Sequence, residues 1–334
     1  MAQAPGTLSL PAQAPGTLVP CYRPIEAWRS TERTVNGKNR IVFDKSETTK
    51  SLNPIHLPCG TCIGCKLDRS LMWAIRCVHE AQQHNQNSFI TLTYSDDNLP
   101  TDRSLTHSHY QTFIRELRRQ YPSLTIRYYM CGEYGTKPRT LDMKTSPGKL
   151  HRPHYHACLF GIDFPDKEIF KEDEGIITYT SDKLTSIWGR GFTTTGDLNF
   201  DTAAYTARYI AKKVTGEKAE EHYQTTCHIT GNLINLEPEY NTMSRRPGIA
   251  YTWFQKYVKD IYPSDYLIHE GHKVKTPRYY DNQLTDEGLE LIKEKRKVHA
   301  RKNQKDNTPE RLAVREKVKQ LKYIKLTRSY ENES

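Results

Sequence analysis

Several features that would place this chain in a membrane, secreted or nucleotide-hydrolysing class are missing from its 334 residues. No run of 18 apolar residues occurs, which argues against a membrane-spanning helix. The N-terminus has neither a basic segment nor an apolar core, so we expect no secretory signal. The sequence Gly-X-X-X-X-Gly-Lys-[Ser/Thr], which cradles nucleotide phosphates in P-loop proteins, is also absent.

Cysteine is too scarce for a disulfide scaffold, with eight residues in the whole chain. Three of them crowd into Cys59-Gly-Thr-Cys62-Ile-Gly-Cys65, a spacing that suits metal binding or reduced thiols and a cytosolic setting. Cys21 could complete a four-thiolate structural Zn²⁺ site, and His56 is a further candidate ligand. Reduced, partly buried thiols remain an equally good interpretation.

Basic residues are concentrated near the C-terminus. Formal net charge is +10 with a pI of about 9.1, which points to a polyanionic partner. Residues 291–328 hold 14 Lys or Arg against four acids, and therefore carry a net charge equal to that of the whole chain. Charges of both signs at helical spacing, with almost no Gly or Pro, predict one or two exposed helices over residues 286–326. A solvated tail and a nucleic-acid arm are both open interpretations.

The order of the predicted elements favours an α+β fold, in which helices pack against an antiparallel sheet. Residues 1–20 repeat Ala-Gln-Ala-Pro-Gly-Thr-Leu and predict a flexible lead-in. We expect a folded domain over residues 21–265 and a basic, largely helical tail over 266–334. The pattern predicts helices at residues 66–83, 109–121 and 203–214 and strands at residues 89–94, 126–130 and 154–160. A Pro-, Gly- and Lys-rich segment at residues 135–150 separates the second and third strands.

A histidine pair on the third predicted strand is a candidate metal site. Side chains two apart face the same side of a strand, so His154 and His156 could hold one ion, while Tyr155 faces the other side. Two imidazoles leave open positions on a divalent ion, as catalysis requires. Glu133, after the preceding strand, is the best third ligand, and its carboxylate would favour Mg²⁺ or Mn²⁺. A hydrogen-bonded histidine pair without metal and a surface glutamate in a Gly-flanked turn are the alternatives.

Two tyrosines lie one turn apart on the predicted helix at residues 203–214. Tyr205 and Tyr209 would stack on one face, and each is followed three residues later by a base, Arg208 or Lys212. A phenol with a pKa near 10 becomes a nucleophile only where cations stabilise its phenolate. The same cations would stabilise charge on a phosphodiester under attack. Packing of an aromatic helix face is the alternative for a chain with 21 tyrosines.

Together these segments resemble the three ordered motifs of rolling-circle replication proteins. The motifs are Phe89-Ile90-Thr91-Leu92-Thr93-Tyr94, Arg152-Pro153-His154-Tyr155-His156 with Gly132-Glu133-Tyr134-Gly135 before it, and Tyr205-X-X-X-Tyr209. The chain is most similar to replication initiation proteins of microviruses, the gokushovirus branch in particular. The resemblance covers roughly residues 21–260 and includes residues 58–65 and 243–249.

The resemblance implies an HUH endonuclease with a ferredoxin/RRM-like core. Carried over by motif, His154 and His156 hold the metal, Tyr205 and Tyr209 are the nucleophiles, and Thr91 is structural. It further implies nicking and rejoining of single-stranded viral origin DNA through a 5′-phosphotyrosine. The partners would be single-stranded or replicative-form viral DNA, with helicase and polymerase supplied by the host, in the bacterial cytoplasm. We expect the DNA-contacting bases to be Arg208, Lys212, Lys213, Arg245 and Arg246.

Two other functions remain compatible with the sequence. A relaxase or transposase of the same nuclease class would use the same histidines and tyrosines on another DNA end. A non-catalytic, zinc-dependent single-stranded DNA-binding protein would use the cysteines and the basic tail and would need neither tyrosine.

Overall fold

A computed structural model describes residues 21–35, 37, 39–47, 54–135, 152–173, 175–209, 213–226, 230–302 and 304–326. The predicted lead-in, almost all of the segment at residues 135–150 and Lys212 lie outside these residues. The described residues divide into two compact units: Ser70–Leu289, and Thr17–Arg69 together with Glu290–Ser329. The domain boundaries expected at residues 20 and 265 stay a prediction.

The elements follow one another along the chain as the bounds below give them. They are β1 (Ile25–Arg33), β2 (Asn39–Val42), η1 (Lys45–Glu47), β3 (Ile55–Leu57), α1 (Ile63–Ala81), β4 (Asn87–Thr93), α2 (His107–Gln120), β5 (Arg127–Tyr134), β6 (Pro153–Phe160), β7 (Glu168–Asp173), β8 (Ile176–Thr180), α4 (Asp182–Trp188), β9 (Thr193–Gly196), α5 (Phe200–Arg208), α6 (Lys218–Tyr223), β10 (Gln224–Thr226), β11 (Leu233–Asn235), β12 (Tyr240–Met243), α7 (Tyr251–Ile261), β13 (Tyr266–His269), β14 (His272–Lys275), α8 (Arg278–Asp281), α9 (Asp286–Lys302), η3 (Gln304–Asp306) and α10 (Pro309–Leu326).

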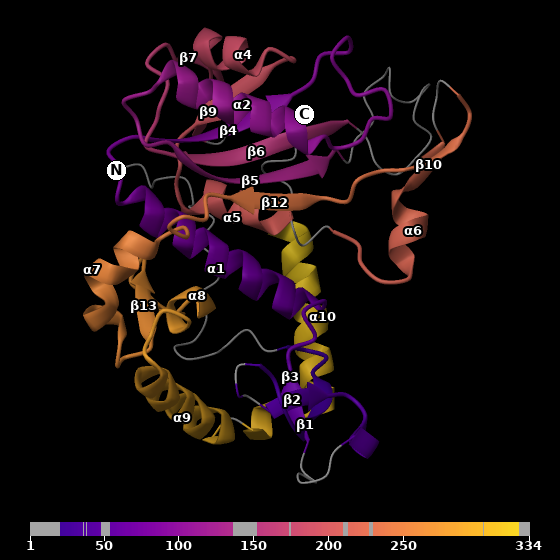
Figure 1. Ribbon diagram of the computed structural model, residues 1–334, viewed down its shortest axis with the longest axis vertical. Coiled ribbons are helices and arrows are strands. Elements are labelled where there is room, and N and C mark those ends of the chain that lie inside the picture. Colours follow the sequence, from indigo (N-terminus) through magenta and orange to yellow (C-terminus); the bar gives the residue numbers. More distant parts are fainter. Residues whose placement is uncertain are drawn as a thin grey trace, which may run out of the picture. The chain divides into compact units, whose positions relative to one another are not determined.

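A seven-stranded sheet forms the centre of the first unit (Figure 1). Its strand order is β12-β5-β6-β4-β9-β8-β7, and every neighbouring pair is antiparallel. β6 pairs along its whole length with β5 on one side and over seven residues with β4 on the other. The predicted α+β fold and the three predicted strands are therefore confirmed, although β5 extends four residues beyond its expected end, to Tyr134.

Strand alternation gives this sheet two differently used faces. Tyr155, Ala157 and Leu159 of β6 belong to a hydrophobic core that includes α2 and α4. Cys158 and Phe160 belong to a second core, with α1, α5 and α7. Because alternate side chains of a strand point to opposite sides, His154 and His156 share the α5 side with Cys158.

The tyrosine helix α5 is fixed at both ends by hydrogen bonds. At its N-terminus, the Asn199 side chain accepts from the Thr202 N–H, and the Thr202 hydroxyl accepts from the Asn199 N–H, each at 2.9 Å. Such caps stabilise a helix by about 1 kcal/mol. Near its C-terminus, the Ser70 hydroxyl of α1 donates to the Ala207 carbonyl at 3.0 Å. These contacts fix both the start and the end of the helix against the sheet.

The helix predicted at residues 203–214 is shorter than expected at its C-terminal end. It ends at Arg208, Tyr209 is its C-cap with helical backbone angles, and Val214 lies outside it. The Val214 N–H donates to the Tyr223 hydroxyl at 3.0 Å instead of to a carbonyl one helical turn back. A tertiary contact from a distant residue therefore replaces the helical hydrogen bond that local propensity predicts.

The second unit combines a short N-terminal sheet with the C-terminal helices. The sheet has three strands in the order β2-β1-β3. The predicted helical tail is confirmed as two helices, α9 and α10, which a short 3₁₀ turn separates. No helix in the described part of the chain is long and apolar enough to cross a membrane.

Candidate active site

Three potential metal ligands meet where β5 and β6 pair. Glu133 on β5 is the direct partner of His154 on β6, and His156 lies two residues further along the same face. The Nε2 atoms of His154 and His156 lie 2.6 Å and 3.1 Å from the same Glu133 carboxylate oxygen, Oε1. All three side chains are buried, and their ligand atoms lie within 4.8 Å of one another. This group could hold a metal ion.

Contacts on the far side of each imidazole orient both rings toward Glu133. The Nδ1 atom of His154 donates to the Arg152 carbonyl at 3.2 Å, and Thr91 Oγ1 lies 2.9 Å from His156 Nδ1. Phe89 stacks parallel to the His156 ring at a centroid distance of 5.7 Å. Outer contacts of this kind fix the orientation of a metal-binding histidine. Thr91 was expected only to be structural, and its contact follows from the register that pairs it with His156.

The charges in this group act on one another. Burial disfavours the ionised form of Glu133, but the two histidines outweigh this effect and lower its pKa to about 2. For Tyr209, burial and then the Glu133 carboxylate raise the phenol pKa well above its usual value. Glu133 is therefore a carboxylate at neutral pH, as a metal ligand must be, whereas the Tyr209 phenol is protonated.

Both tyrosines of α5 contact the same histidine. The Tyr209 ring stacks on His156 at 5.2 Å with an interplanar angle of 13°, and the Tyr205 ring meets it edge-on at 5.1 Å. The two phenol rings contact each other at 4.6 Å. Tyr205 is 9% exposed and Tyr209 is 4% exposed, so both lie against the candidate metal ligands rather than in solvent. The structure thus brings together the motif residues of β5, β6 and α5.

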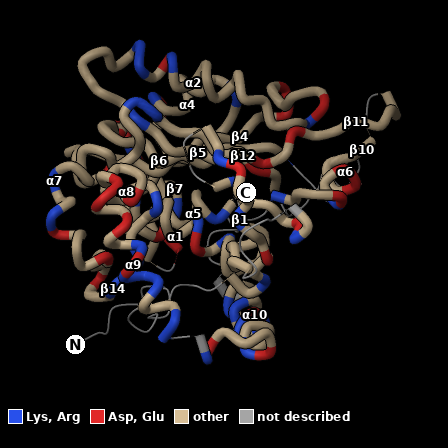
Figure 2. Tube along the Cα trace, turned by 60° about the horizontal axis from the view of Figure 1, so that its bottom comes forward, with Lys and Arg blue, Asp and Glu red and all other residues tan. Residues whose placement is uncertain are grey.

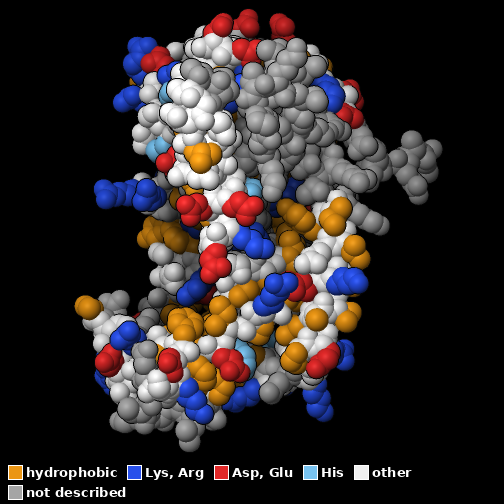
Figure 3. All heavy atoms as spheres, turned by 90° about the vertical axis from the view of Figure 1, so that its right-hand side faces the viewer, with side chains coloured by type: hydrophobic (Ala, Val, Ile, Leu, Met, Phe, Trp, Pro, Cys, Tyr) orange, Lys and Arg blue, Asp and Glu red, His pale blue; other side chains and the backbone are white. Residues whose placement is uncertain are grey.

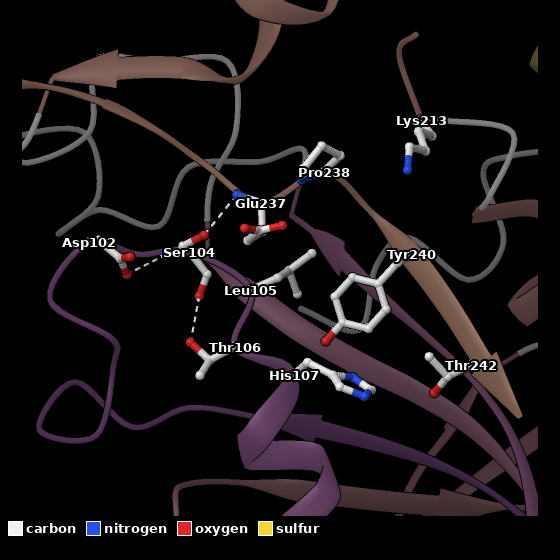
Figure 4. Close-up of a pocket in the computed structure, with 10 residues that line it drawn as sticks. All are labelled: Asp102, Ser104, Leu105, Thr106, His107, Lys213, Glu237, Pro238, Tyr240 and Thr242. Carbon is white, nitrogen blue, oxygen red and sulfur yellow. Dashed lines mark hydrogen bonds between the residues drawn. The ribbon is translucent and has the colours of Figure 1, made fainter.

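The candidate DNA-contacting bases do not form one group with these residues. Arg208 is the last residue of α5 and is partly exposed. Lys213 instead lines a cavity of about 640 Å³ with residues of β12 and of the segment before α2 (Figure 4). Tyr240 of that cavity packs with the core on the α2 side of the sheet, so Lys213 is on the side opposite the tyrosines.

Arg245 and Arg246 are exposed in the loop after β12. The Ser244 N–H donates to the Tyr128 carbonyl near the start of β5, and Arg127 donates to the Pro247 carbonyl at 2.8 Å. Glu133 lies five residues further along β5, or about 17 Å at ~3.4 Å per residue. Bases at this distance can contact only a DNA segment several nucleotides from the reacting phosphate.

The four cysteines predicted to bind metal come together in the second unit. The sulfur atoms of Cys21, Cys59, Cys62 and Cys65 lie within 4.8 Å of one another. Backbone N–H groups donate to these sulfurs, with Cys59 N 3.2 Å from Cys21 Sγ and Cys62 N 3.3 Å from Cys59 Sγ. Although burial disfavours the Cys59 thiolate, N–H and hydroxyl donors lower the pKa of this thiol to about 6. His56 is not part of the group, and its Nε2 lies 3.6 Å from a Glu26 carboxylate oxygen instead.

Comparisons with known proteins agree with this arrangement. Residues 87–214, which contain β4 to α5, match the family model of the replication-associated protein ORF2. Replication-associated protein ORF2 of Spiroplasma virus 4 is 31% identical over 304 residues, which cover 84% of this chain and 87% of that protein. Replication-associated protein VP4 of Bdellovibrio phage phiMH2K is 30% identical, over 78% of this chain and 76% of that protein. For replication-associated protein ORF4 of Chlamydia phage 1 the identity is 27%, over 78% of this chain and 61% of that protein.

No solved structure matches the chain. The family follows from the sequence relatives, because the similarity to the Spiroplasma virus protein extends through nearly the full length of both chains. The chain belongs to the replication initiation proteins of microviruses.

Proposed function

We propose that this protein is a rolling-circle replication initiator of the HUH endonuclease class, which nicks and rejoins single-stranded origin DNA through a phosphotyrosine. The observation that carries the proposal is the contact of Tyr205 and Tyr209 with His156, beside Glu133 and His154. A packing role alone would not require two phenols, two imidazoles and an ionised carboxylate to be buried together. Burying such polar groups is unfavourable unless they are paired, and it is common at reactive sites.

One carboxylate and two imidazoles are a suitable donor set for Mg²⁺ or Mn²⁺. Glu133 Oε1 faces both Nε2 atoms, and the outer contacts with Thr91 and with the Arg152 carbonyl hold those atoms in this orientation. A divalent cation in this group would polarise the scissile phosphate and offset the Glu133 charge that raises the Tyr209 pKa. Glu133, His154 and His156 are the residues that would hold it.

The tyrosines carry the covalent step. A phenol oxygen attacks the scissile phosphorus, a phosphotyrosine bond forms, and the bond to the 3′ oxygen breaks. The phenol loses its proton and the leaving 3′ oxygen gains one, so the free 3′-OH can prime a polymerase. The covalent bond retains the energy of the phosphodiester for rejoining. Since both phenols are buried, side chains around α5 must move before DNA reaches them.

Two tyrosines one helical turn apart explain how a replication round can end. While one tyrosine remains bound to the 5′ end, the other can cleave the regenerated origin. The newly freed 3′-OH then attacks the first phosphotyrosine and closes a unit-length circle. Their shared contact with His156 supports this role, because either phenol is already beside the same ligand group.

The DNA substrate is unpaired at the reacting phosphate. Arg208 follows Tyr205 on α5 and contacts the strand near the reacting phosphate, as Lys212 would. Lys213, Arg245 and Arg246 contact nucleotides further away, in keeping with their positions outside the tyrosine group. Helicase and polymerase come from the host, and the protein acts in the bacterial cytoplasm.

A nicking assay tests this function. Supercoiled double-stranded viral DNA that contains the origin should be converted to the open circle by the purified protein with Mg²⁺ or Mn²⁺. EDTA should prevent the conversion. Equal nicking in EDTA would contradict the metal-dependent mechanism, and binding without any nicking would favour a non-catalytic single-stranded DNA-binding protein.

Glu133→Ala should raise the metal concentration needed for half-maximal nicking. The change removes the only carboxylate of the ligand group, and even outer contacts of metal ligands contribute ~10–100-fold to affinity, so we expect a shift of at least about tenfold. A metal titration of the nicking rate measures it. Glu172→Ala, which removes an exposed glutamate from β7, is the matched control. An unchanged titration for Glu133→Ala would remove this residue from the site.

The cysteine group is proposed to hold one structural Zn²⁺. Four sulfurs within 4.8 Å of one another, with N–H donors to two of them, match the ligands of structural zinc sites. Freshly purified, reduced protein should contain about one zinc per chain, which Cys59→Ser/Cys62→Ser should lose. Elemental analysis is the measurement, with the buried Cys158→Ser as the control. Wild-type protein without zinc would retire this site but not the nuclease.

A further inference from the structure

Positive charge is divided unequally between the two compact units. Residues 70–289, which contain the tyrosines and histidines, have 26 basic against 27 acidic residues. Residues 17–69 and 290–329 together have 23 basic against 10 acidic residues, a net charge of +13. Neutralisation of phosphates by Lys and Arg provides most of the non-specific affinity for DNA. The unit that carries the proposed chemistry is thus poorly equipped to supply this affinity, and the other unit is rich in it.

The basic helix α10 packs directly on the cysteine group. Leu312 is 6% exposed and forms a hydrophobic cluster with Tyr22 and Cys62, against which Cys21, Cys59 and Cys65 also pack. Glu316, one turn further along, forms an ion pair with Arg23 at 3.0 Å. The Tyr22 N–H in turn donates to Cys62 Sγ at 3.4 Å. The residues that contact α10 are therefore cysteine ligands or immediate neighbours of one.

One face of α10 makes these contacts, and the other is available. Leu312, Glu316 and Lys319 follow the i, i+4, i+7 spacing of a single helix face and are buried or partly buried. Arg311, Lys317 and Lys322 are exposed, and Figure 2 shows basic positions along α10. Exposed apolar residues such as Val314 and Val318 lie between them, and Figure 3 shows such mixed hydrophobic and basic surface. Since Glu316 is paired with Arg23, the exposed positions carry mainly positive charge.

We infer that the cysteine-bound metal holds α10 in place, and that the resulting unit is a second DNA-binding module that contacts the phosphate backbone without sequence preference. This inference rests on the proposed zinc site. Four thiolates crowded within 4.8 Å repel one another unless a cation lies between them. Loss of the metal would spread the cysteines apart and remove the surface on which Leu312 packs. The helix would then lose its position, and its bases would no longer act together.

Metal removal from the full chain tests the coupling. Protein stripped with a zinc-selective chelator, with Mg²⁺ present throughout, is compared with untreated and zinc-restored protein. The probe is a fluorescent single-stranded oligonucleotide without origin sequence, and anisotropy gives the Kd at several salt concentrations. We expect at least tenfold weaker binding, and a slope of log K against log salt that is smaller by ~2, as for about three lost phosphate contacts. Trypsin should cut within α10 only after the metal is removed, and added Zn²⁺ should reverse both effects.

Charge variants test the role of α10 without disturbing the cysteines. Arg311→Gln/Lys317→Gln/Lys322→Gln removes three exposed bases and should reproduce the weaker binding and smaller slope while keeping one zinc. Lys183→Gln/Lys256→Gln/Lys259→Gln removes three exposed bases from the other unit and should change the slope less. Single-turnover nicking of a saturating origin oligonucleotide should remain within about twofold of wild type for the α10 variant.

The outcomes separate this inference from the zinc site and from the nuclease. Protein without zinc would overturn both the zinc site and the coupling. Zinc-containing protein whose salt slope and trypsin pattern do not change on stripping would overturn the coupling and leave the zinc site standing. An α10 charge variant with unchanged Kd and slope would overturn the DNA-binding role, as would a variant that changes only the oligomeric state. Nicking can fail or persist independently of each result.

Discussion

Replacing either His154 or His156 by alanine should lower the nicking rate by ~10³-fold or more, since removing a group that acts with others typically abolishes their joint effect. Each variant removes one of the two imidazoles whose Nε2 atoms face Glu133 Oε1. Binding of DNA should change little, because phosphate contacts elsewhere supply most of the affinity. Single-turnover cleavage of a labelled origin oligonucleotide and anisotropy on the same oligonucleotide separate the two effects.

A matched control is available on an exposed strand. His272→Ala removes a solvent-exposed histidine of β14 and should leave nicking unchanged. Thermal unfolding of all variants shows whether loss of a buried imidazole has instead destabilised the domain. Full nicking by the His154→Ala/His156→Ala double variant would show that these residues do not hold the catalytic metal.

The second large effect concerns the tyrosines. Tyr205→Phe/Tyr209→Phe should form no covalent adduct with a single-stranded origin oligonucleotide, whereas at least one of the single variants should still form it. Phenylalanine keeps the rings that pack on His156 and removes only the nucleophilic oxygen. Both single variants should fail to release closed circles over repeated rounds, since that step needs one tyrosine occupied while the other attacks. Denaturing gels of the labelled adduct, and circle counting in a replication assay, are the measurements.

Tyr110→Phe is the corresponding control. It removes a hydroxyl from a fully buried tyrosine of α2, on the opposite face of the sheet. Adduct formation by this variant should equal that of wild type. An adduct of wild-type yield from the Tyr205→Phe/Tyr209→Phe variant would mean that α5 contributes packing and that another tyrosine reacts.

Local sequence pattern predicted the parts of the site that depend on a single element. The alternation of β6 places His154 and His156 on one face and Tyr155 on the other. The one-turn spacing of Tyr205 and Tyr209 puts both phenols on one side of α5. Glu133 was expected after its strand, yet β5 continues to Tyr134, so a regular strand pairing places this carboxylate opposite His154.

The contacts that the sequence did not predict join residues far apart in the chain. Thr91 reaches His156 only through the register of β4 with β6, and Ser70 holds α5 from a helix more than 130 residues earlier. The shortened end of α5 depends on Tyr223, and the position of Arg246 depends on the pairing of β12 with β5. Periodicity within one element carries no information on which distant element packs against it. The same reason hid the packing of Leu312 on Cys62, 250 residues apart in sequence.

Identifying the residue that becomes linked to DNA tests the central claim most directly. Wild-type protein would be incubated with Mn²⁺ and a short single-stranded origin oligonucleotide, and the trapped adduct would be digested with nuclease and protease. Mass spectrometry of the remaining nucleotide-bearing peptide should locate a 5′-phosphotyrosine at Tyr205 or Tyr209. A phosphotyrosine elsewhere in the chain, or cleavage of the oligonucleotide with no covalent adduct, would contradict the account.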